Sequence, residues 1–488
     1  MSSASKSDPR GAVDATAAAP DAADSLVIVE SYGSEAGGGF IADQCTGHPR
    51  RPQRKYSLRP ARFRGPLVSP SVPHDPYAAL RVRNYRWFIV SLMTMTISSQ
   101  IQGVVVAWQI YDITHDPLSL GLMGLAEALP FIGVALYAGH VADLLNRHRV
   151  AIASLTVLLA CSVSLLVFNL IPGFLRDHGA WPFYAVIFVS GLARSFLQPA
   201  RNALGAEIVD RSLYANAVAW RSSTWQTAAV VGPALGGLIY GFTSPRVAYV
   251  ADAIMMAIAV LTFAVITYTA HEAPKEPESI AESLQSGLRF VFRESVLLSA
   301  LTLDLFSVLL GGAEALLPVF ADQILRVGPQ GLGILRAAPA AGAVIASVYL
   351  AHRPPFKRAG RTLLYAVATF ALCIIAFGVS RSFLLSVLVL AISGMADNVS
   401  VLIRSTLLQV LTPAHLLGRV SSVNSIFVGS SNELGAFESG VAAKLLGTVT
   451  SVVLGGLASL GVVIGIGVTV PRLRRLRRID DPALRAEG

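Results

Sequence analysis

From Trp87 onward the chain alternates between long apolar runs and short polar links, and this alternation restricts the fold more than any other feature. Each run approaches the roughly 20 residues that an α-helix needs to cross the hydrocarbon core of a bilayer. Twelve such runs are present, at residues 87–111, 118–141, 149–172, 182–203, 215–242, 247–270, 296–322, 331–352, 362–380, 383–408, 420–447 and 449–471. The sequence therefore predicts an all-α integral membrane protein with 12 transmembrane helices.

The composition favours a membrane protein over a soluble one. Hydrophobic residues make up 53% of the 488 positions and charged residues only 14%, and the mean hydropathy is +0.58. Such a chain is too apolar for an ordinary soluble domain. The net charge of +9 is divided among short links and two tails, which argues against a nucleic-acid-binding surface. Cys45, Cys161 and Cys373 offer neither a disulfide framework nor the spacing of a metal site.

Basic residues are concentrated on alternate links, and this asymmetry predicts the orientation of the chain in the membrane. The poorer side carries only Arg176, Arg246, Arg326 and Arg381. The richer side carries Arg147, Arg149, Arg211, Lys275, Arg289, Arg293, Arg353, Lys357, Arg358, Arg361, Arg419 and the tail at 472–478. Because cytoplasmic loops hold an excess of Lys and Arg, both termini are expected in the cytoplasm.

The chain is predicted to have five parts. Residues 1–80 lack periodicity and indicate a disordered cytoplasmic tail, unless the start codon is wrongly assigned. Two six-helix halves, 81–270 and 296–471, flank a linker at 271–295, and a basic cytoplasmic tail follows at 472–488. The linker has an apolar stripe at helical spacing, which predicts an interfacial helix.

The two halves repeat one another. Asp112, Pro117, Gly121 and His140 recur in the same order as Asp322, Pro329, Gly333 and His352. Duplication of a six-helix unit in parallel orientation is the architecture of the major facilitator transporters, which place their site at mid-membrane between the halves.

The link at residues 139–149 carries a carboxylate and two arginines, so it is expected outside the hydrocarbon core. It resembles the loop between the second and third helices of the major facilitator superfamily. Gly139, Asp143 and Arg147 match the pattern of that loop, whereas Leu144 and Asn146 depart from it. The resemblance implies a gating loop formed by Gly139, Asp143, Arg147 and Arg149, with Asp143 docked near residues 418–421 at the start of the eleventh helix.

A second motif lies in the fifth apolar run, at Gly232, Pro233, Gly236 and Gly237. Proline bends a helix, and glycines let a neighbouring helix approach closely. Ordinary packing of small residues is the alternative interpretation. The run also resembles the exporter motif of the superfamily, with Ala228 in place of the first glycine, and the resemblance implies export.

The resemblance covers about residues 75–475 and points to the bacterial branch that contains the enterobactin exporters. It implies proton-driven efflux of a small molecule, such as a siderophore or drug, from a bacterial inner membrane. It further implies a functional monomer without cofactors, whose partners are its cargo, protons and membrane lipid. An importer, a lysolipid flippase and a non-transporting sensor remain alternatives. An enzyme is not expected, because no nucleophile and base are paired in the sequence.

Ionisable side chains inside the apolar runs are the candidate functional groups. A charge at the bilayer centre costs about 2.5–3.5 kcal/mol even on insertion scales, so each must be paired, hydrated or functional. Asp304, Asp397 and Glu433 lie deepest along their helices and are the predicted proton carriers, with structural ion pairing as the alternative. The predicted cavity residues are Gln102, Trp108, Gln109, Glu127, Arg194, Glu314, Arg404 and Asn432.

Overall fold

A computed structural model describes residues 75–268, 280–353, 356–413 and 416–476, and all of the described elements are helices. The first half contains α1 (Ala78–Arg81), α2 (Arg83–Thr114), α3 (Pro117–Leu144), α4 (Arg147–Leu170), α5 (Phe174–His178), α6 (Trp181–Glu207), η1 (Arg211–Leu213), α7 (Tyr214–Phe242) and α8 (Pro245–Ala264). The linker forms α9 (Ile280–Arg293). The second half contains α10 (Ser295–Leu310), η2 (Ala313–Leu316), α11 (Leu317–Val319), η3 (Phe320–Ile324), α12 (Gly328–Ala351), α13 (Ala359–Val379), α14 (Phe383–Leu411), α15 (Leu417–Leu446), α16 (Thr448–Thr469) and α17 (Pro471–Arg475).

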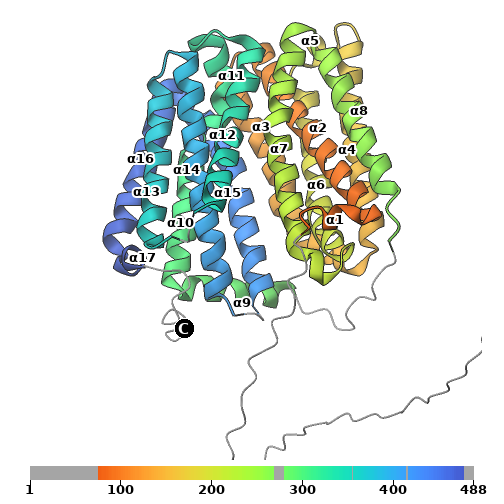
Figure 1. Cartoon of the computed structure of the whole chain (residues 1–488). Helices are drawn as coiled ribbons and strands as arrows, with labels where there is room; N and C mark the ends of the chain where they lie inside the picture. Colours follow the sequence, from red (N-terminus) through yellow and green to blue (C-terminus); the bar gives the residue numbers. More distant parts are fainter. Residues whose placement is uncertain (1–74, 269–279, 354–355, 414–415, 477–488) are drawn as a thin grey trace, which may run out of the picture. The chain divides into compact units, whose positions relative to one another are not determined.

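The long helices of the described residues run between two faces (Figure 1). We call the end where α2 begins and α16 ends the tail face; it lies at the bottom of Figure 1, and the opposite end is the distal face. Three helix starts are capped by short polar side chains at the links. Asn146 caps α4 by accepting from two backbone N–H groups, and Asp116 and Ser244 cap α3 and α8 by accepting from one N–H each.

Within the described residues, nine helical segments are long and apolar enough to cross a membrane. Three further helices, α6, α7 and α15, have 27, 29 and 30 residues and carry more polar side chains. The predicted apolar runs therefore fall on long helices, with one interruption in the seventh run, and the predicted count of 12 crossings stays a prediction.

The seventh predicted run, at residues 296–322, is not one continuous helix. α10 ends at Leu310, the chain bends through Gly311 and Gly312, and it continues as a 3-10 turn, a short α-helix and a π-turn. Two consecutive glycines weaken a helix, and Pro318 in the following turn has no N–H to donate. The predicted run still forms one helical segment of membrane-spanning length, Ser295–Ile324, and the break within it opens into the interior of the protein.

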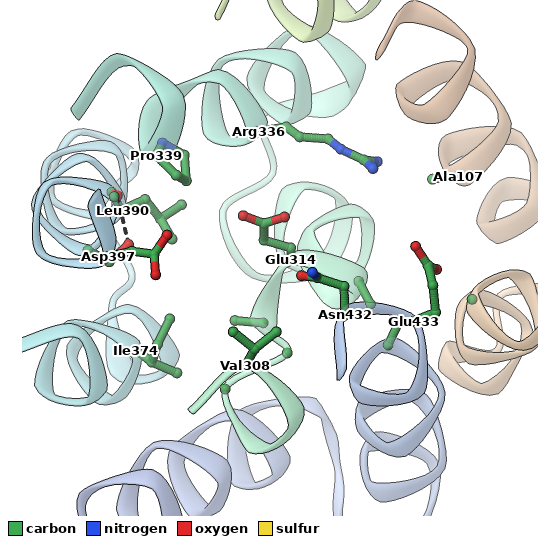
Figure 2. Close-up of a pocket in the computed structure, with 18 of the residues that line it drawn as sticks. Ala107, Val308, Glu314, Arg336, Pro339, Ile374, Leu390, Asp397, Asn432 and Glu433 are labelled. Atoms are coloured by element: carbon green, nitrogen blue, oxygen red, sulfur yellow. Dashed lines mark hydrogen bonds between the residues drawn. The ribbon is translucent and has the colours of Figure 1, made fainter. Parts of the chain in front are cut away.

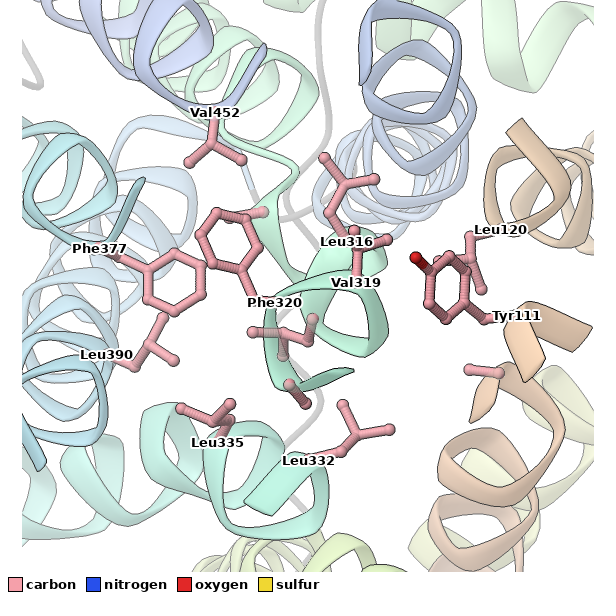
Figure 3. Packing of buried hydrophobic residues seen from close by; sticks show 14 of the residues in the cluster. Tyr111, Leu120, Leu316, Val319, Phe320, Leu332, Leu335, Phe377, Leu390 and Val452 are labelled. Carbon is pink, nitrogen blue, oxygen red and sulfur yellow. The ribbon is translucent and has the colours of Figure 1, made fainter. Parts of the chain in front are cut away.

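The two halves meet at the distal face through an apolar cluster (Figure 3). Tyr111 and Leu120 come from the first half, and Leu316, Phe320 and Leu332 come from the second. All five side chains are at most 3% exposed. A shared core of this kind closes the space between the halves on the distal side.

The predicted linker helix is present as α9. It packs against the tail end of α15, where a Cβ added at Gly287 would lie 3.0 Å from the carbonyl oxygen of Arg419. The missing side chain of Gly287 thus lets the linker helix approach the α15 backbone closely.

Candidate functional site: a charged cavity between the halves

A cavity of about 560 Å³ lies between the two halves on the tail side of the apolar cluster. This volume is within the roughly 300–1,000 Å³ range of sites for small molecules. Its lining includes Gln100 and Glu127 from the first half, and Glu314, Asp397 and Glu433 from the second. Two hollows of about 230 and 450 Å³ share lining residues with it and extend the space towards the tail face.

Four predicted site residues of the second half gather around this cavity. Figure 2 shows Glu314, Asp397, Asn432 and Glu433 directed into the same space, although they come from η2, α14 and α15. Asp397 and Glu433 are two of the three predicted proton carriers. The structure therefore places them in contact with the space that a transported molecule would occupy.

Glu127 and Arg194 form an ion pair that joins α3 to α6. Both side chains also line the hollow nearer the tail face, opposite Glu433. Arg336 of α12 completes this group: its Nη1 donates to the carbonyl oxygen of Gly103 at 3.2 Å, across the boundary between the halves. Arg336 was not among the site residues predicted from the sequence, although a base inside an apolar run is the signal that could have indicated it.

The third predicted proton carrier, Asp304, lies elsewhere. Its carboxylate forms an ion pair with Arg404, which joins α10 to α14, and the two side chains are only 8% and 6% exposed. Arg404 lines the hollow on the tail side, whereas Asp304 does not line any of these three spaces. The charges of both partners act on Asp397, which lies on the same helix as Arg404.

Three predicted cavity residues of α2 also lie outside these spaces. Gln109 is hydrogen bonded to Asn169 at 2.7 Å and to the hydroxyl of Tyr249 at 2.7 Å, so it joins α2 to α4 and α8. Trp108 packs edge-on against Tyr240 in the distal cluster. Gln102 is 8% exposed and does not line these spaces. The prediction that Gln102, Trp108 and Gln109 line the cavity was wrong, because α2 presents only one of its faces to the cavity.

Gln100 of α2 and Trp225 of α7 line the cavity, as had been predicted for Gln102, Trp108 and Gln109. Each lines both the main cavity and the hollow towards the tail face, and the Trp225 side chain is 54% exposed. Trp225 lies in the fifth run between Arg221 and the glycine motif, and only its aromatic character among small residues would have indicated a role.

An ion pair between the halves closes the distal end. Lys444 Nζ at the end of α15 lies 2.7 Å from Asp116 Oδ2, which precedes α3. Partial burial acts to raise the pKa of Asp116, but the hydrogen bond from Lys444, the N–H of Leu118 and the charge of Lys444 outweigh it. The pKa of Asp116 consequently lies below its ordinary value.

The glycine motif of α7 is enclosed by two other helices. A Cβ at Gly232 or Gly236 would meet α2 at 2.6 Å from Gln100 and 3.0 Å from Ile101. A Cβ at Gly237 would lie 2.6 Å from Cα of Gly333 in α12. A Cβ added at Gly333 would lie 2.6 Å from the carbonyl oxygen of Pro233. The motif therefore allows α7 to contact its own half and the opposite half with almost no side chain between the backbones.

The structure describes the predicted gating loop only in part. The surroundings of Gly139 and the side chain of Asp143 are not among the described parts of the structure, so the predicted docking of Asp143 stays a prediction. Arg147 forms an ion pair with Glu207 at the tail end of α6, within the first half. Arg149 is exposed in the first turn of α4.

Comparison with known proteins agrees with this architecture. Residues 74–485 match the family model described as transmembrane secretion effector. The enterobactin exporter EntS of Escherichia coli O157:H7 (strain EC4115 / EHEC) is 24% identical over 406 residues, which are 83% of this chain and 96% of the relative. EntS of Escherichia coli O6:K15:H31 (strain 536 / UPEC) is 25% identical over 406 residues, covering 83% and 95%.

Solved transporters share the fold at low sequence identity. A POT family transporter in complex with a thioalcohol-conjugated peptide has a TM-score of 0.64 at 11% identity, with 80% of this chain and 96% of the other covered. The nucleoside transporter NupG has a TM-score of 0.62 at 12% identity, with 80% and 100% covered. The match over nearly the whole helical region shows that this chain belongs to the transmembrane secretion effector family of the major facilitator superfamily.

Proposed function

We propose that this protein is a proton-coupled exporter of a small molecule that works by alternating access in a bacterial inner membrane. In this proposal 12 crossings form two six-helix halves, and the basic tail face is cytoplasmic. The observation that carries the proposal is the cavity of about 560 Å³ between the halves, which holds intramembrane carboxylates and is closed at the distal end. The enterobactin exporter relatives are named as exporters, and this supports transport out of the cell.

The contacts between the halves suit a rocking motion. α3 meets α15 at Gly121 and Gly440, and α7 meets α12 at Gly237 and Gly333. Helices without intervening side chains can pivot on one another without repacking a large interface. Separation of the Asp116–Lys444 pair and of the distal cluster would open the cavity to the other side of the membrane.

The cavity carboxylates supply a means of coupling to protons. A carboxyl group in an apolar cavity prefers the neutral form, and a nearby arginine favours the charged form. Asp397 and Glu433 line the cavity; Asp397 is influenced by Arg404 of its own helix, and Glu433 by Arg194 and Arg336 of two other helices. We assign them as the proton carriers. Asp304 is instead assigned to positioning, because it is buried in an ion pair with Arg404 and does not line the cavity.

The test is proton-driven efflux measured in inverted membrane vesicles with a panel of candidate compounds. Asp397→Asn and Glu433→Gln should each lower pH-gradient-driven transport by about tenfold or more, because general proton transfer steps are worth at least that factor. Each variant should still exchange cargo down its own gradient, since downhill exchange needs no proton transfer. Wild-type rates of gradient-driven efflux in both variants would refute the coupling assignment.

A further inference from the structure

The break after α10 gives the cavity a negative end that the proposed function does not use. α10 stops at Leu310, and Val308, Gly311 and Gly312 line the cavity at that point. The last carbonyl groups of a helix have no partner within it and carry the negative end of the helix dipole. A helix that ends at a cavity wall inside a membrane therefore attracts cations towards that wall.

Two carboxylates stand beside this helix end. Glu314 lies in the 3-10 turn just after the break, and Asp397 faces the same space from α14 (Figure 2). Within the part of the chain that the structure describes, neither forms a salt bridge with Lys, Arg or His. The two negative charges are close enough to act on one another.

The remaining charges of the cavity neutralise each other. Glu127 and Glu433 share their surroundings with Arg194 and Arg336, so two acids face two bases. The negative charge of Asp304 is balanced by its ion-pair partner Arg404. Arg201 lines the hollow nearer the tail face, seven positions or about 10 Å along α6 from Arg194. The excess of negative charge is thus confined to Glu314, Asp397 and the end of α10.

The walls around this acidic end are apolar and aromatic. Val308, Ile374 and Leu390 surround the space between Glu314 and Asp397 in Figure 2, and Phe370 lines the same cavity. Trp225 contributes an exposed indole from the opposite half. Aromatic faces attract cations, and apolar walls favour a large organic body over a hydrated metal ion.

We infer that the cargo is a lipophilic organic cation whose positive centre is held between Glu314 and Asp397 at the end of α10. This inference rests on the proposed function and adds the substrate class. Cation and proton would then compete for the same carboxylates: when the cation binds, the proton on Asp397 leaves, and when a proton returns, the cation is released. An anionic cargo would have to enter a region with two like charges.

The test uses two probes of equal shape and opposite charge, tetraphenylphosphonium and tetraphenylborate, bound to the purified full-length protein in detergent. Equilibrium dialysis against micelles alone removes the contribution of partitioning. We expect saturable binding of the phosphonium, about tenfold or more tighter than that of the borate. Phosphonium binding should release protons, and its affinity should fall as the pH is lowered.

Variants locate the site. Glu314→Gln with Asp397→Asn should weaken phosphonium binding by about tenfold or more while raising the affinity for the borate. Asp210→Asn is the matched control, because Asp210 is exposed at the tail face and makes no side-chain cap to η1. It should bind both probes as the wild type does.

Equal binding of the two probes by the wild type, or unchanged phosphonium binding by the double variant, overturns the cation site. If the double variant does not fold, the cation site is tested by the wild type alone. The absence of proton release on phosphonium binding, or of a preference for the phosphonium over the borate, then overturns the cation site. Phosphonium binding as expected without any gradient-driven efflux would leave the cation site standing and defeat the exporter. Efflux restricted to anions, without phosphonium binding, would overturn the cation site and leave the exporter standing.

Discussion

At the residue scale, the buried charges of this protein divide into those that are matched within the fold and those that are left for a ligand. Asp304 and Arg404 belong to the first group, because each is almost fully buried and each is the other's partner. Glu314 and Asp397 belong to the second, since both reach the cavity. Sequence depth alone could not separate them: Asp304 and Asp397 are similarly deep, and only the packing of α10 against α14 determines which one meets the arginine.

The Asp304–Arg404 pair gives a prediction about stability. Removing one partner of a buried ion pair leaves an uncompensated charge and costs about 3–5 kcal/mol, whereas apolar replacement of both costs much less. Asp304→Leu should therefore lower the thermal unfolding temperature in detergent strongly, and Asp304→Leu combined with Arg404→Met should restore most of it. A double variant that is less stable than the single one would contradict the assignment of Asp304 as a positioning residue.

The distal pair Asp116–Lys444 gives a prediction about pH. Because the pKa of Asp116 is lowered, its contribution to closure is present above the ordinary carboxyl pKa of about 3.9 and is lost as pH falls through the lowered value. Acidification to about pH 5 should leave the pair intact, so Asp116 is not the proton sensor.

A variant that removes the Asp116–Lys444 ion pair tests how much the pair contributes to closure of the distal face. The side chains are 35% and 50% exposed, so the contact is worth at most about 1 kcal/mol, or about a fivefold change in the closed population. Lys444→Gln should shift the population of distal-closed molecules by no more than this factor, measured by energy transfer between labels across the distal face. Complete loss of closure would mean that the apolar cluster contributes less than its burial indicates.

At the element scale, the helices were largely predictable and their contacts were not. Apolar runs of membrane-spanning length are local features of the sequence, and each predicted run coincides with a long helix except at the break after Leu310. Gly311 and Gly312 were visible in the sequence, but their effect depends on the cavity that faces them. The sequence could not predict the orientation of α2 either, because Gln109 is turned away from the cavity by its hydrogen bonds to Asn169 and Tyr249.

The crossing of α7 and α12 gives a prediction at this scale. A Cβ at Gly237 would lie 2.5 Å from the carbonyl oxygen of Pro329, closer than van der Waals contact, so the two helices would have to separate. Gly237→Ala should cost about 1–3 kcal/mol through overpacking and should slow transport.

Gly461→Ala is the control, because a Cβ at Gly461 of α16 meets nothing within 4 Å. This change should be neutral or stabilise the helix by up to about 1 kcal/mol. Equal effects of the two substitutions on unfolding and transport would show that the close crossing of α7 and α12 has no special role.

At the scale of the whole molecule, the proposed transport depends on relative motion of the two halves. The described structure has the distal face closed by Asp116, Lys444 and the apolar cluster, and its cavity continues towards the tail face. Alternating access requires a second state in which these distal contacts part and the tail face closes. The duplicated sequence pattern predicted two equivalent halves, but not which face the cavity reaches.

The most direct measurement is a pair of spin-label distances recorded by double electron–electron resonance in lipid nanodiscs. One pair, at exposed Asp177 and Arg381, spans the distal face, and the other, at exposed Ser212 and Lys357, spans the tail face. Lowering the pH from about 8 to about 5, which protonates buried carboxyl groups, should lengthen the distal distance and shorten the tail distance in the same sample. If both distances change in the same direction, or neither changes with pH or with added cargo, the rocking of two halves about a central cavity is contradicted.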